Sequence, residues 1–294
     1  MGLPFFILDV FAERKYAGNQ LAVVIDKDGL PESTMQDIAR EMHFSETAFV
    51  RPEAQADGSF AARIFTPEHE VPFAGHPTLG TAFAIREEII RKPVREVVLD
   101  LATGHIAVTF TGEGGASGIL WMRQNSPAFT KDFDRATVAE VLSIPVDAID
   151  PGFPVQEVST GLPFILVPLA SRNAVTMAKI NRTAYDTLIS TTAAKAVLVF
   201  CREPVHTENT LHARMFGDYY GVPEDPATGS ATGCLAGYLL RNGYFSEMPP
   251  VVRVEQGYAV NRPSLLYCKA AKSGDLIDVD VGGNVIMVAR GELL

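Results

Sequence analysis

The sequence predicts an α+β fold made of two pseudo-symmetric halves, each a mostly antiparallel β-barrel or roll around a central helix. Strand-like apolar runs outnumber helical segments, the βαβα rhythm of a doubly wound sheet is missing, and several segments recur in one order along the chain. We expect a first half over residues 1–118 and a second over residues 119–294, with the last strand free to return to the first half.

The internal repeat rests on segment pairs that follow one another in the same order. Residues 30–50, LPESTMQDIAREMHFSETAFV, align without a gap with residues 180–200, INRTAYDTLISTTAAKAVLVF. AGHPTLGTAFAI, from residue 74, lies over TGSATGCLAGYL, from residue 228. GNQLAVVI and ARIF have the counterparts GLPFILVP and ARMF. The shared order indicates two copies of one unit, and the glycine-rich TGEGGASG at residues 111–118 suits the boundary between them.

Each copy contains short apolar runs that predict strands and a few helical patterns. The expected strands of the first half are FFILDVF, LAVVI, TAFV, AARIF, VVLDL and HIAVTF; those of the second are GILWMR, FILVPL, AVLVF, LHARMF, VVRVEQG, LLYCKAA, LIDVDV and VIMVAR. Helices are expected at residues 33–42, 77–88, 137–142, 182–190 and 231–241. The two aligned helices, 77–88 and 231–241, are apolar almost all round, so each should be buried inside its half.

Composition and charge exclude several classes of protein. The chain is 47% hydrophobic with a formal net charge of -10 and no basic stripe, so nucleic acid and anionic membranes are poor partners. It has no run of 18 apolar residues, and from its first residues we expect no secretory signal. The three widely spaced cysteines fit reduced thiols, and we expect a cytoplasmic protein.

The beginnings of the two aligned helices predict a binding site for a small carboxylate. The first N–H groups of a helix lack partners within the helix and carry partial positive charge. Gly75 and His76 open the first helix, and Gly229 and Ser230 open the second. Ordinary helix capping is the alternative for each segment alone. Because both copies keep a small-residue opening, we favour an anion site shared by the two helix ends.

Residues that differ between the copies are the candidates for chemistry. Glu46 stands where the second copy has Ala196, between a helix and an apolar strand, so we expect it to be partly buried with a raised pKa suited to proton transfer. His76 aligns with Ser230 and could carry a proton or bind substrate. Asp225 precedes the second helix opening, where it could hold a polar substrate group or brace the turn.

These motifs resemble the phenazine-biosynthesis isomerase (PhzF-like) family, which is related to diaminopimelate epimerase. The resemblance is carried by LDVFAERKYAGNQLAVV, FSETAFV, ARIFTPEHEVPFAGHPTLGTA and GVPEDPATGSATG, in that order. It implies a homodimer that needs no cofactor, with the active site between the halves. It assigns the acid/base role to Glu46 and substrate binding to Gly75, His76, Asp225 and Ser230. The chain departs from the family in one motif, where GNQ replaces the consensus GNP.

The resulting prediction is a cofactor-independent isomerase in which Glu46 moves a proton between carbons of a small carboxylated metabolite. Asp225, Gly229 and Ser230 would orient that metabolite. A racemase or epimerase of an amino-acid-like substrate is one alternative, although no cysteine stands at either helix opening as two-thiol chemistry requires. A non-catalytic binder of small carboxylates is the other. No metal is expected, since the sequence has no H-E-x-x-H motif.

Overall fold

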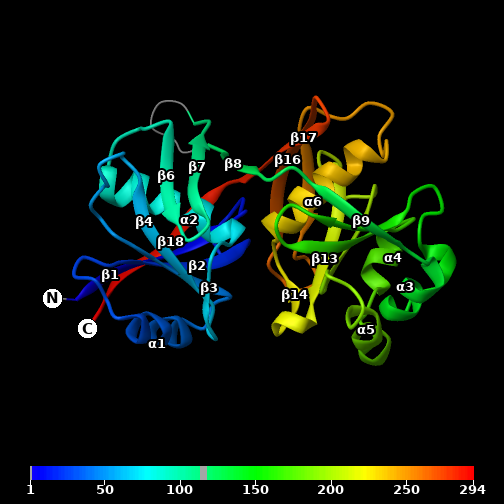
Figure 1. The fold of residues 1–294 in the computed structure, drawn as a ribbon, viewed down its shortest axis with the longest axis horizontal. Helices are drawn as coiled ribbons and strands as arrows, with labels where there is room; N and C mark the ends of the chain where they lie inside the picture. Colours follow the sequence, from blue (N-terminus) through cyan, green and yellow to red (C-terminus); the bar gives the residue numbers. More distant parts are fainter. Residues whose placement is uncertain (1, 113–117) are drawn as a thin grey trace. The chain divides into compact units, whose positions relative to one another are not determined.

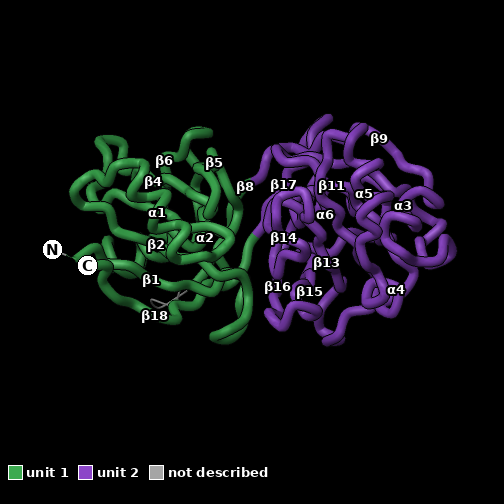
Figure 2. Tube along the Cα trace, turned by 90° about the horizontal axis from the view of Figure 1, so that it is seen from below, with its two compact units in different colours: residues 1–123, 282–294 green, residues 124–281 purple. Residues whose placement is uncertain are grey.

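The computed structural model describes residues 2–112 and 118–294, so residues 113–117 of the expected boundary segment lie outside the described residues. The chain forms two compact units (Figure 2): unit 1 contains residues 1–123 and 282–294, and unit 2 contains residues 124–281. The units divide after residue 123, whereas the sequence predicted a boundary after residue 118. The last strand joins unit 1, which is the option that the sequence left open.

Unit 1 is a curved sheet with helices on its two faces (Figure 1). Its elements are β1 (Leu3–Val10), β2 (Asn19–Ile25), α1 (Glu32–Met42), β3 (Glu46–Val50), β4 (Phe60–Phe65), β5 (Glu70–Val71), α2 (Gly75–Ala84), the π-helix η1 (Ile85–Ile90), β6 (Glu96–Leu101), β7 (Gly104–Phe110), β8 (Leu120–Gln124) and β18 (Val285–Leu293). The strands pair in the order β18, β1, β2, β3, β4, β6, β7 and β8. The first and last strands are antiparallel neighbours, so the two termini lie side by side.

Unit 2 contains a corresponding series of elements. They are β9 (Ala128–Phe133), α3 (Arg135–Leu142), the 3-10 helix η2 (Val146–Ala148), β10 (Val155–Ser159), β11 (Pro163–Pro168), α4 (Arg172–Met177), α5 (Arg182–Ile189), β12 (Ala196–Cys201), β13 (Leu211–Gly217), the 3-10 helix η3 (Asp218–Tyr220), β14 (Val222–Asp225), α6 (Gly229–Arg241), β15 (Val252–Gln256), β16 (Ser264–Ser273) and β17 (Leu276–Gly283). Its strands pair in the order β9, β10, β11, β12, β13, β15 and β16. Within the described residues, the pairings do not close either sheet into a ring.

Strand registers reproduce the repeat that the sequence predicts. In unit 1 the parallel pair β2–β3 places Leu21 opposite Glu46, and in unit 2 the parallel pair β11–β12 places Phe164 opposite Ala196. The next pair follows the same rule, because β3–β4 joins Val50 to Ala62 and β12–β13 joins Phe200 to Ala213. A one-residue slip would turn every side chain to the other face of its sheet, so agreement in register is strong support for equivalent halves.

The two aligned helices are the buried centres of their units. Helix α2 contacts β1, β2, β3, β6, β7 and β18, and α6 contacts β10, β11 and β16. All residues from His76 to Ala84 are buried, as are those from Ala231 to Leu239. Both helices begin two residues earlier than the sequence predicts, at Gly75 and Gly229, which are aligned positions in the repeat. The expected pair of central helices is therefore confirmed, with corrected starts.

Helices on the outer face of each sheet complete the cores. Met35 and Ala39 of α1 pack with Val24, Phe49 and Phe65. Helices α3, α4 and α5 share one hydrophobic cluster of unit 2 with β11 and β12. The sequence missed α4, β5, β9, β10 and β14, which are short or lack an apolar run. No helix among the described residues is both long and apolar enough to cross a membrane.

Candidate active site

Glu46 begins β3 and faces the central helix of unit 1. Its register partner Leu21 points at α2, since a Cβ added to Gly80 would lie 2.5 Å from Leu21 Cδ2. Register partners on neighbouring strands project from the same face of a sheet, so Glu46 points the same way. Its side chain is 19% exposed. The sequence-based expectation of a partly buried acid between helix and strand is confirmed.

His76, the second residue of α2, lies against Glu46. Its Nε2 is 3.4 Å from Glu46 Oε2 and 3.3 Å from the carbonyl oxygen of Gln20. A carbonyl oxygen only accepts, so we assign the imidazole proton to Nε2, which donates. Burial lowers the pKa of His76 from 6.5 to about 3, so the ring is neutral at physiological pH. The Glu46–His76 contact is therefore a close approach of a carboxyl oxygen to a neutral imidazole and is not an ion pair.

Gln20, which replaces the family proline, contributes its backbone to this arrangement. The carbonyl oxygen of Gln20 is the group near His76 Nε2. Because side chains alternate along a strand and Leu21 packs on α2, the Gln20 side chain projects from the opposite face of the sheet. A proline at this position would present the same carbonyl oxygen.

In unit 2, Asp225 lies within a closed hydrogen-bond network just before α6. Thr228 Oγ1 donates to Asp225 Oδ2 at 2.5 Å, and Gln256 Nε2 donates to the Asp225 carbonyl oxygen at 2.8 Å and to Thr228 Oγ1 at 3.1 Å. The Thr228 N–H donates to Gln256 Oε1 at 3.3 Å. The alternative that Asp225 braces the turn is thus part of the structure, and the network also holds its carboxylate in one orientation.

The beginnings of the two central helices lack the usual side-chain caps. At Ala74 and Thr228, the residues that precede α2 and α6, no side chain accepts from the first helical turn. By contrast, Asp134, Ser171 and Asn181 cap α3, α4 and α5 in that way. Ser230 is the second residue of α6 and so is not its cap. Uncapped first turns of this kind are suited to an external anion.

The cysteines are poorly placed for base catalysis. All three are buried, and burial raises the pKa of Cys201 to about 11 and those of Cys234 and Cys268 to about 12. Only a thiolate removes a proton effectively, and these thiols are protonated at neutral pH. None of them belongs to the first turn of α2 or α6.

Sequence reasoning missed Thr228 and Gln256. Thr228 stands within the quoted PEDPATGSATG motif, where its N-cap position could have been noticed. Gln256 has no such signal, because it reaches the motif from β15, about 30 residues later in the chain. The structure brings Glu46, Gly75 and His76 together in unit 1. Within unit 2 it brings Asp225 close to the residues that open α6, Gly229 and Ser230.

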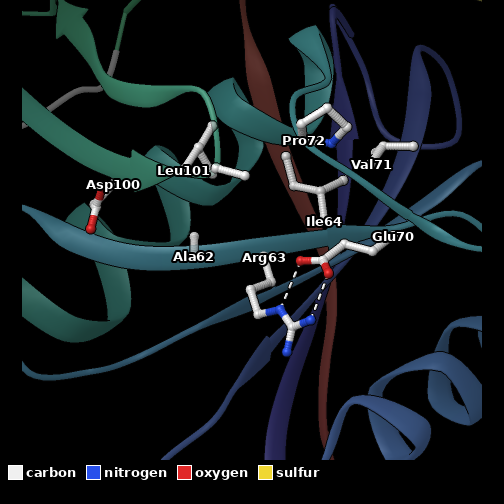
Figure 3. Close-up of a pocket in the computed structure, with 9 residues that line it drawn as sticks. Ala62, Arg63, Ile64, Glu70, Val71, Pro72, Asp100 and Leu101 are labelled. Carbon is white, nitrogen blue, oxygen red and sulfur yellow. Dashed lines mark hydrogen bonds and ion pairs between the residues drawn. The ribbon is translucent and has the colours of Figure 1, made fainter.

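A surface pocket of about 300 Å³ lies in unit 1 between β5 and β6 (Figure 3). Ala62, Ile64, Val71, Pro72, Leu101 and Ala102 supply apolar walls, and Arg63, Glu70 and Asp100 supply charged groups. None of the site residues predicted from the sequence lines this pocket. It occupies a break along β4, which pairs with β6 at residues 60–61 and with β5 at residues 64–65.

Comparison with known proteins gives concordant results. The family model described as phenazine biosynthesis-like protein matches residues 8–291. A trans-2,3-dihydro-3-hydroxyanthranilate isomerase of Pseudomonas fluorescens is 35% identical, with 99% of each chain covered. The PhzF-family phenazine biosynthesis protein of Bacillus anthracis superposes with a TM-score of 0.90 at 26% identity, covering 100% of this chain and 99% of that one.

A more distant structure supports the fold alone. A probable proline racemase of Agrobacterium radiobacter superposes with a TM-score of 0.65 at 12% identity, covering 99% of this chain and 93% of that one. The two-halved α+β architecture is therefore that of the epimerase-like proteins. Together with the full-length match to curated isomerases, these findings identify the chain as an isomerase that belongs to the phenazine biosynthesis-like, or PhzF, family.

Proposed function

We propose that this isomerase moves a proton between two carbons of a small carboxylated metabolite, with Glu46 as the acid/base group. The observation that carries the proposal is the 3.4 Å contact between Glu46 Oε2 and the neutral His76 at the uncapped start of α2. Trans-2,3-dihydro-3-hydroxyanthranilate, the compound in the names of the Pseudomonas relatives, is the first substrate to test.

The proposed reaction needs one group that both accepts and returns a proton. The Glu46 carboxylate takes a proton from an activated C–H bond, the double bonds shift, and the carboxylic acid returns the proton to another carbon. Substrate and product are isomers, so no electron acceptor is required. His76, whose Nε2–H donates to the Gln20 carbonyl oxygen, lies against the carboxylate and limits its position.

We assign binding of the substrate's carboxylate and polar substituents to the helix openings and to Asp225. Fixed N–H donors at a helix start attract an anion without reorganising. The Asp225 carboxylate, already held by Thr228, would receive a hydrogen bond from an amine or hydroxyl of the same substrate. A homodimer is part of this proposal, as the family resemblance implies.

Epimerisation remains a second form of the same acid/base chemistry. Fold neighbours of the racemase type support it only at the level of architecture. The buried, protonated cysteines argue against a two-thiol mechanism. Epimerisation removes a proton from one face of a carbon and returns one to the opposite face, so it would need a second acid besides Glu46. We therefore favour proton transfer to a different carbon.

The test is turnover of trans-2,3-dihydro-3-hydroxyanthranilate in deuterated water by the wild type, E46Q and the control E53Q. Glu53 is exposed in unit 1 and has no part in the proposed site. We expect E46Q to lose about 10²- to 10⁴-fold in kcat, and E53Q to keep it. Product should be identified by chromatography, because direct transfer within the substrate leaves no deuterium. Equal turnover by E46Q and wild type would refute the role of Glu46.

A further inference from the structure

Each unit contains an arginine–glutamate pair at the same place in the repeat. In unit 1, Arg63 Nε donates to Glu70 Oε1 at 2.7 Å and Arg63 Nη2 donates to Glu70 Oε2 at 2.6 Å (Figure 3). In unit 2, Arg214 Nε donates to Glu224 Oε1 at 3.0 Å and Arg214 Nη2 donates to Glu224 Oε2 at 2.8 Å. The same two nitrogens meet the same two oxygens in both units.

The aromatic contacts and the chain positions of the two pairs also correspond. The guanidinium of Arg63 stacks over Phe65 at 5.1 Å, and that of Arg214 stacks over Phe216 at 4.8 Å. The arginines are the second residues of ARIF and ARMF. The glutamates open the segments EVPFAG and EDPATG, each five positions before the first residue of the central helix. Such agreement in atoms and spacing indicates that the same structural element occurs in both copies of the repeat.

Each pair links the strand next to the centre of the sheet to the segment that enters the central helix. Arg63 belongs to β4, whose neighbour β3 begins with Glu46, and Glu70 belongs to β5, which leads to Gly75 and His76. Arg214 belongs to β13, and Glu224 directly precedes Asp225. A bidentate arginine–carboxylate pair fixes angle as well as distance, which a single hydrogen bond does not.

We propose that these two clamps, Arg63–Glu70 and Arg214–Glu224, are positioning elements that set the first turn of each central helix against its own sheet. Clamp 1, Arg63–Glu70, keeps His76 on Glu46. Clamp 2, Arg214–Glu224, keeps Asp225 in its network with Thr228 and Gln256. This inference rests on the proposed function, in which Glu46 transfers the proton and Asp225 binds substrate. Loss of clamp 1 should therefore lower kcat, and loss of clamp 2 should raise KM.

Glu32 supplies a matched control for clamp 1. It also accepts a hydrogen bond from Arg63 Nη2, at 2.8 Å, but it lies on α1 and is 70% exposed. The variants E70Q and E32Q each remove one negative charge beside the same arginine. Only E70Q releases the segment that leads into α2. In unit 2 the pair is about 90% buried, so E224D, which keeps the charge but shortens the side chain, accompanies E224Q in case E224Q does not fold.

The experiment measures backbone amide exchange and steady-state kinetics on the same variants, with trans-2,3-dihydro-3-hydroxyanthranilate as the substrate probe. Among residues 75–79, all but Pro77 have an exchangeable amide, and for E70Q we expect about tenfold faster exchange at these amides only. We also expect about tenfold lower kcat, with KM within about threefold of wild type. For the unit 2 variants we expect faster exchange at residues 229–233 and about fivefold higher KM. E32Q should match the wild type.

Two results would overturn the inference. One is an E70Q variant that matches E32Q in exchange and in kcat. The other is exchange that rises throughout unit 1 while kcat stays unchanged, which would make clamp 1 a general stabiliser. If wild type does not convert the probe, the proposed function fails for that substrate; the exchange pattern alone then decides, since local acceleration at residues 75–79 supports the clamp and its absence rejects it.

Discussion

Each sheet has a gap beside the strand that carries the clamp arginine, β4 in unit 1 and β13 in unit 2. This gap is open in unit 1 and bridged in unit 2. In unit 1 the gap along β4 is lined by Val71 and Leu101 and forms the pocket of Figure 3. The equivalent gap along β13 is crossed by Gln256, which bonds the Asp225 carbonyl oxygen. Register makes Leu101 the counterpart of Gln256, because Ala61–Asp100 and His212–Glu255 are equivalent pairs. One scaffold thus carries an open pocket in one copy and a polar hydrogen-bond network in the other.

At the position of the proposed chemistry, unit 1 has titratable side chains and unit 2 has residues that do not titrate in their place. Unit 1 has Glu46 and His76 where the repeat of unit 2 has Ala196 and Ser230. The proposed proton-transfer groups are therefore concentrated in one copy, and the hydrogen-bond network around Asp225 lies in the other. The two copies thus differ in their polar groups while they share strand registers and clamps.

The largest effect on the free energy of unfolding should come from replacing Gly257, at the turn after Gln256, with the alanine that unit 1 has at the equivalent position. Gly257 has φ +81°, and a Cβ there would lie 2.3 Å from Arg262 O and 2.5 Å from Pro226 O. Unit 1 has Ala102 at the aligned position. We expect G257A to destabilise the protein by about 2–4 kcal/mol through strain and overpacking. Thermal unfolding measures this, and A102G serves as the mild reciprocal change. An equal, small effect of both variants would show that the two turns do not differ.

A smaller effect is expected from replacing the bridging side chain itself. Q256L gives unit 2 the residue of unit 1 and removes the hydrogen bonds to Asp225 and Thr228. The loss should cost about 1–3 kcal/mol of unfolding free energy, because buried polar groups lose partners. It should also raise KM, since Asp225 loses its support. Denaturant titration with kinetics provides the check, and unchanged KM would separate this network from substrate binding.

The free energy of unfolding should fall as the pH falls because of the neutral, buried His76. Its counterpart Ser230 does not titrate and makes no such contribution. In the unfolded chain His76 binds a proton below about pH 6.5, whereas the folded protein resists protonation until about pH 3. The unfolded state therefore gains stability as pH falls through that window. Glu255, whose net pKa is lowered to about 2, adds a loss only below its ordinary value of 4.5. Burial opposes that lowering, but hydrogen bonds from His212, Asn209 and two backbone N–H groups outweigh it.

The corresponding measurement compares unfolding free energies of wild type and H76Q between pH 7 and pH 5. Wild type should lose stability over this range more steeply than H76Q, which has no imidazole to protonate. Parallel curves for the two proteins would mean that His76 is charged or freely exposed in the folded state. The result is independent of any substrate.

The smallest effect is expected at Gln20. Its carbonyl oxygen meets His76 while its side chain projects from the other face of the sheet, so Q20P keeps the group that matters. We expect kcat and KM to stay within about threefold of wild type. A change in substrate preference on making Q20P would show that the side chain does reach the substrate.

The sequence alone predicted the repeat, the two central helices and a partly buried Glu46 between a helix and an apolar strand. These features follow from local patterns, since apolar periodicity and small residues at a helix start are visible within a dozen positions. The clamps were within reach, because ARIF and ARMF align and EVPFAG and EDPATG share glutamate, proline and glycine at equal spacing. Their bidentate contacts were missed because the alignment of the two helical segments began at residues 74 and 228, after both glutamates.

Other features could not be inferred from one sequence. The role of Gln256 depends on β15 pairing beside β13, a contact between segments about 40 residues apart. The contact of His76 with the Gln20 carbonyl depends on a backbone atom, which no residue type reveals. The low pKa of His76 follows from its burial, which the residue type alone does not reveal. Such facts arise from tertiary packing.

The division of tasks between the units is tested most directly by measuring ligand binding and turnover together in E46Q and D225N. The account predicts that E46Q binds trans-2,3-dihydro-3-hydroxyanthranilate as wild type does, within about threefold in Kd, but loses turnover. D225N should bind at least about tenfold more weakly. The opposite pattern, with affinity lost in E46Q and retained in D225N, would contradict the assignment of proton transfer to unit 1 and substrate binding to unit 2.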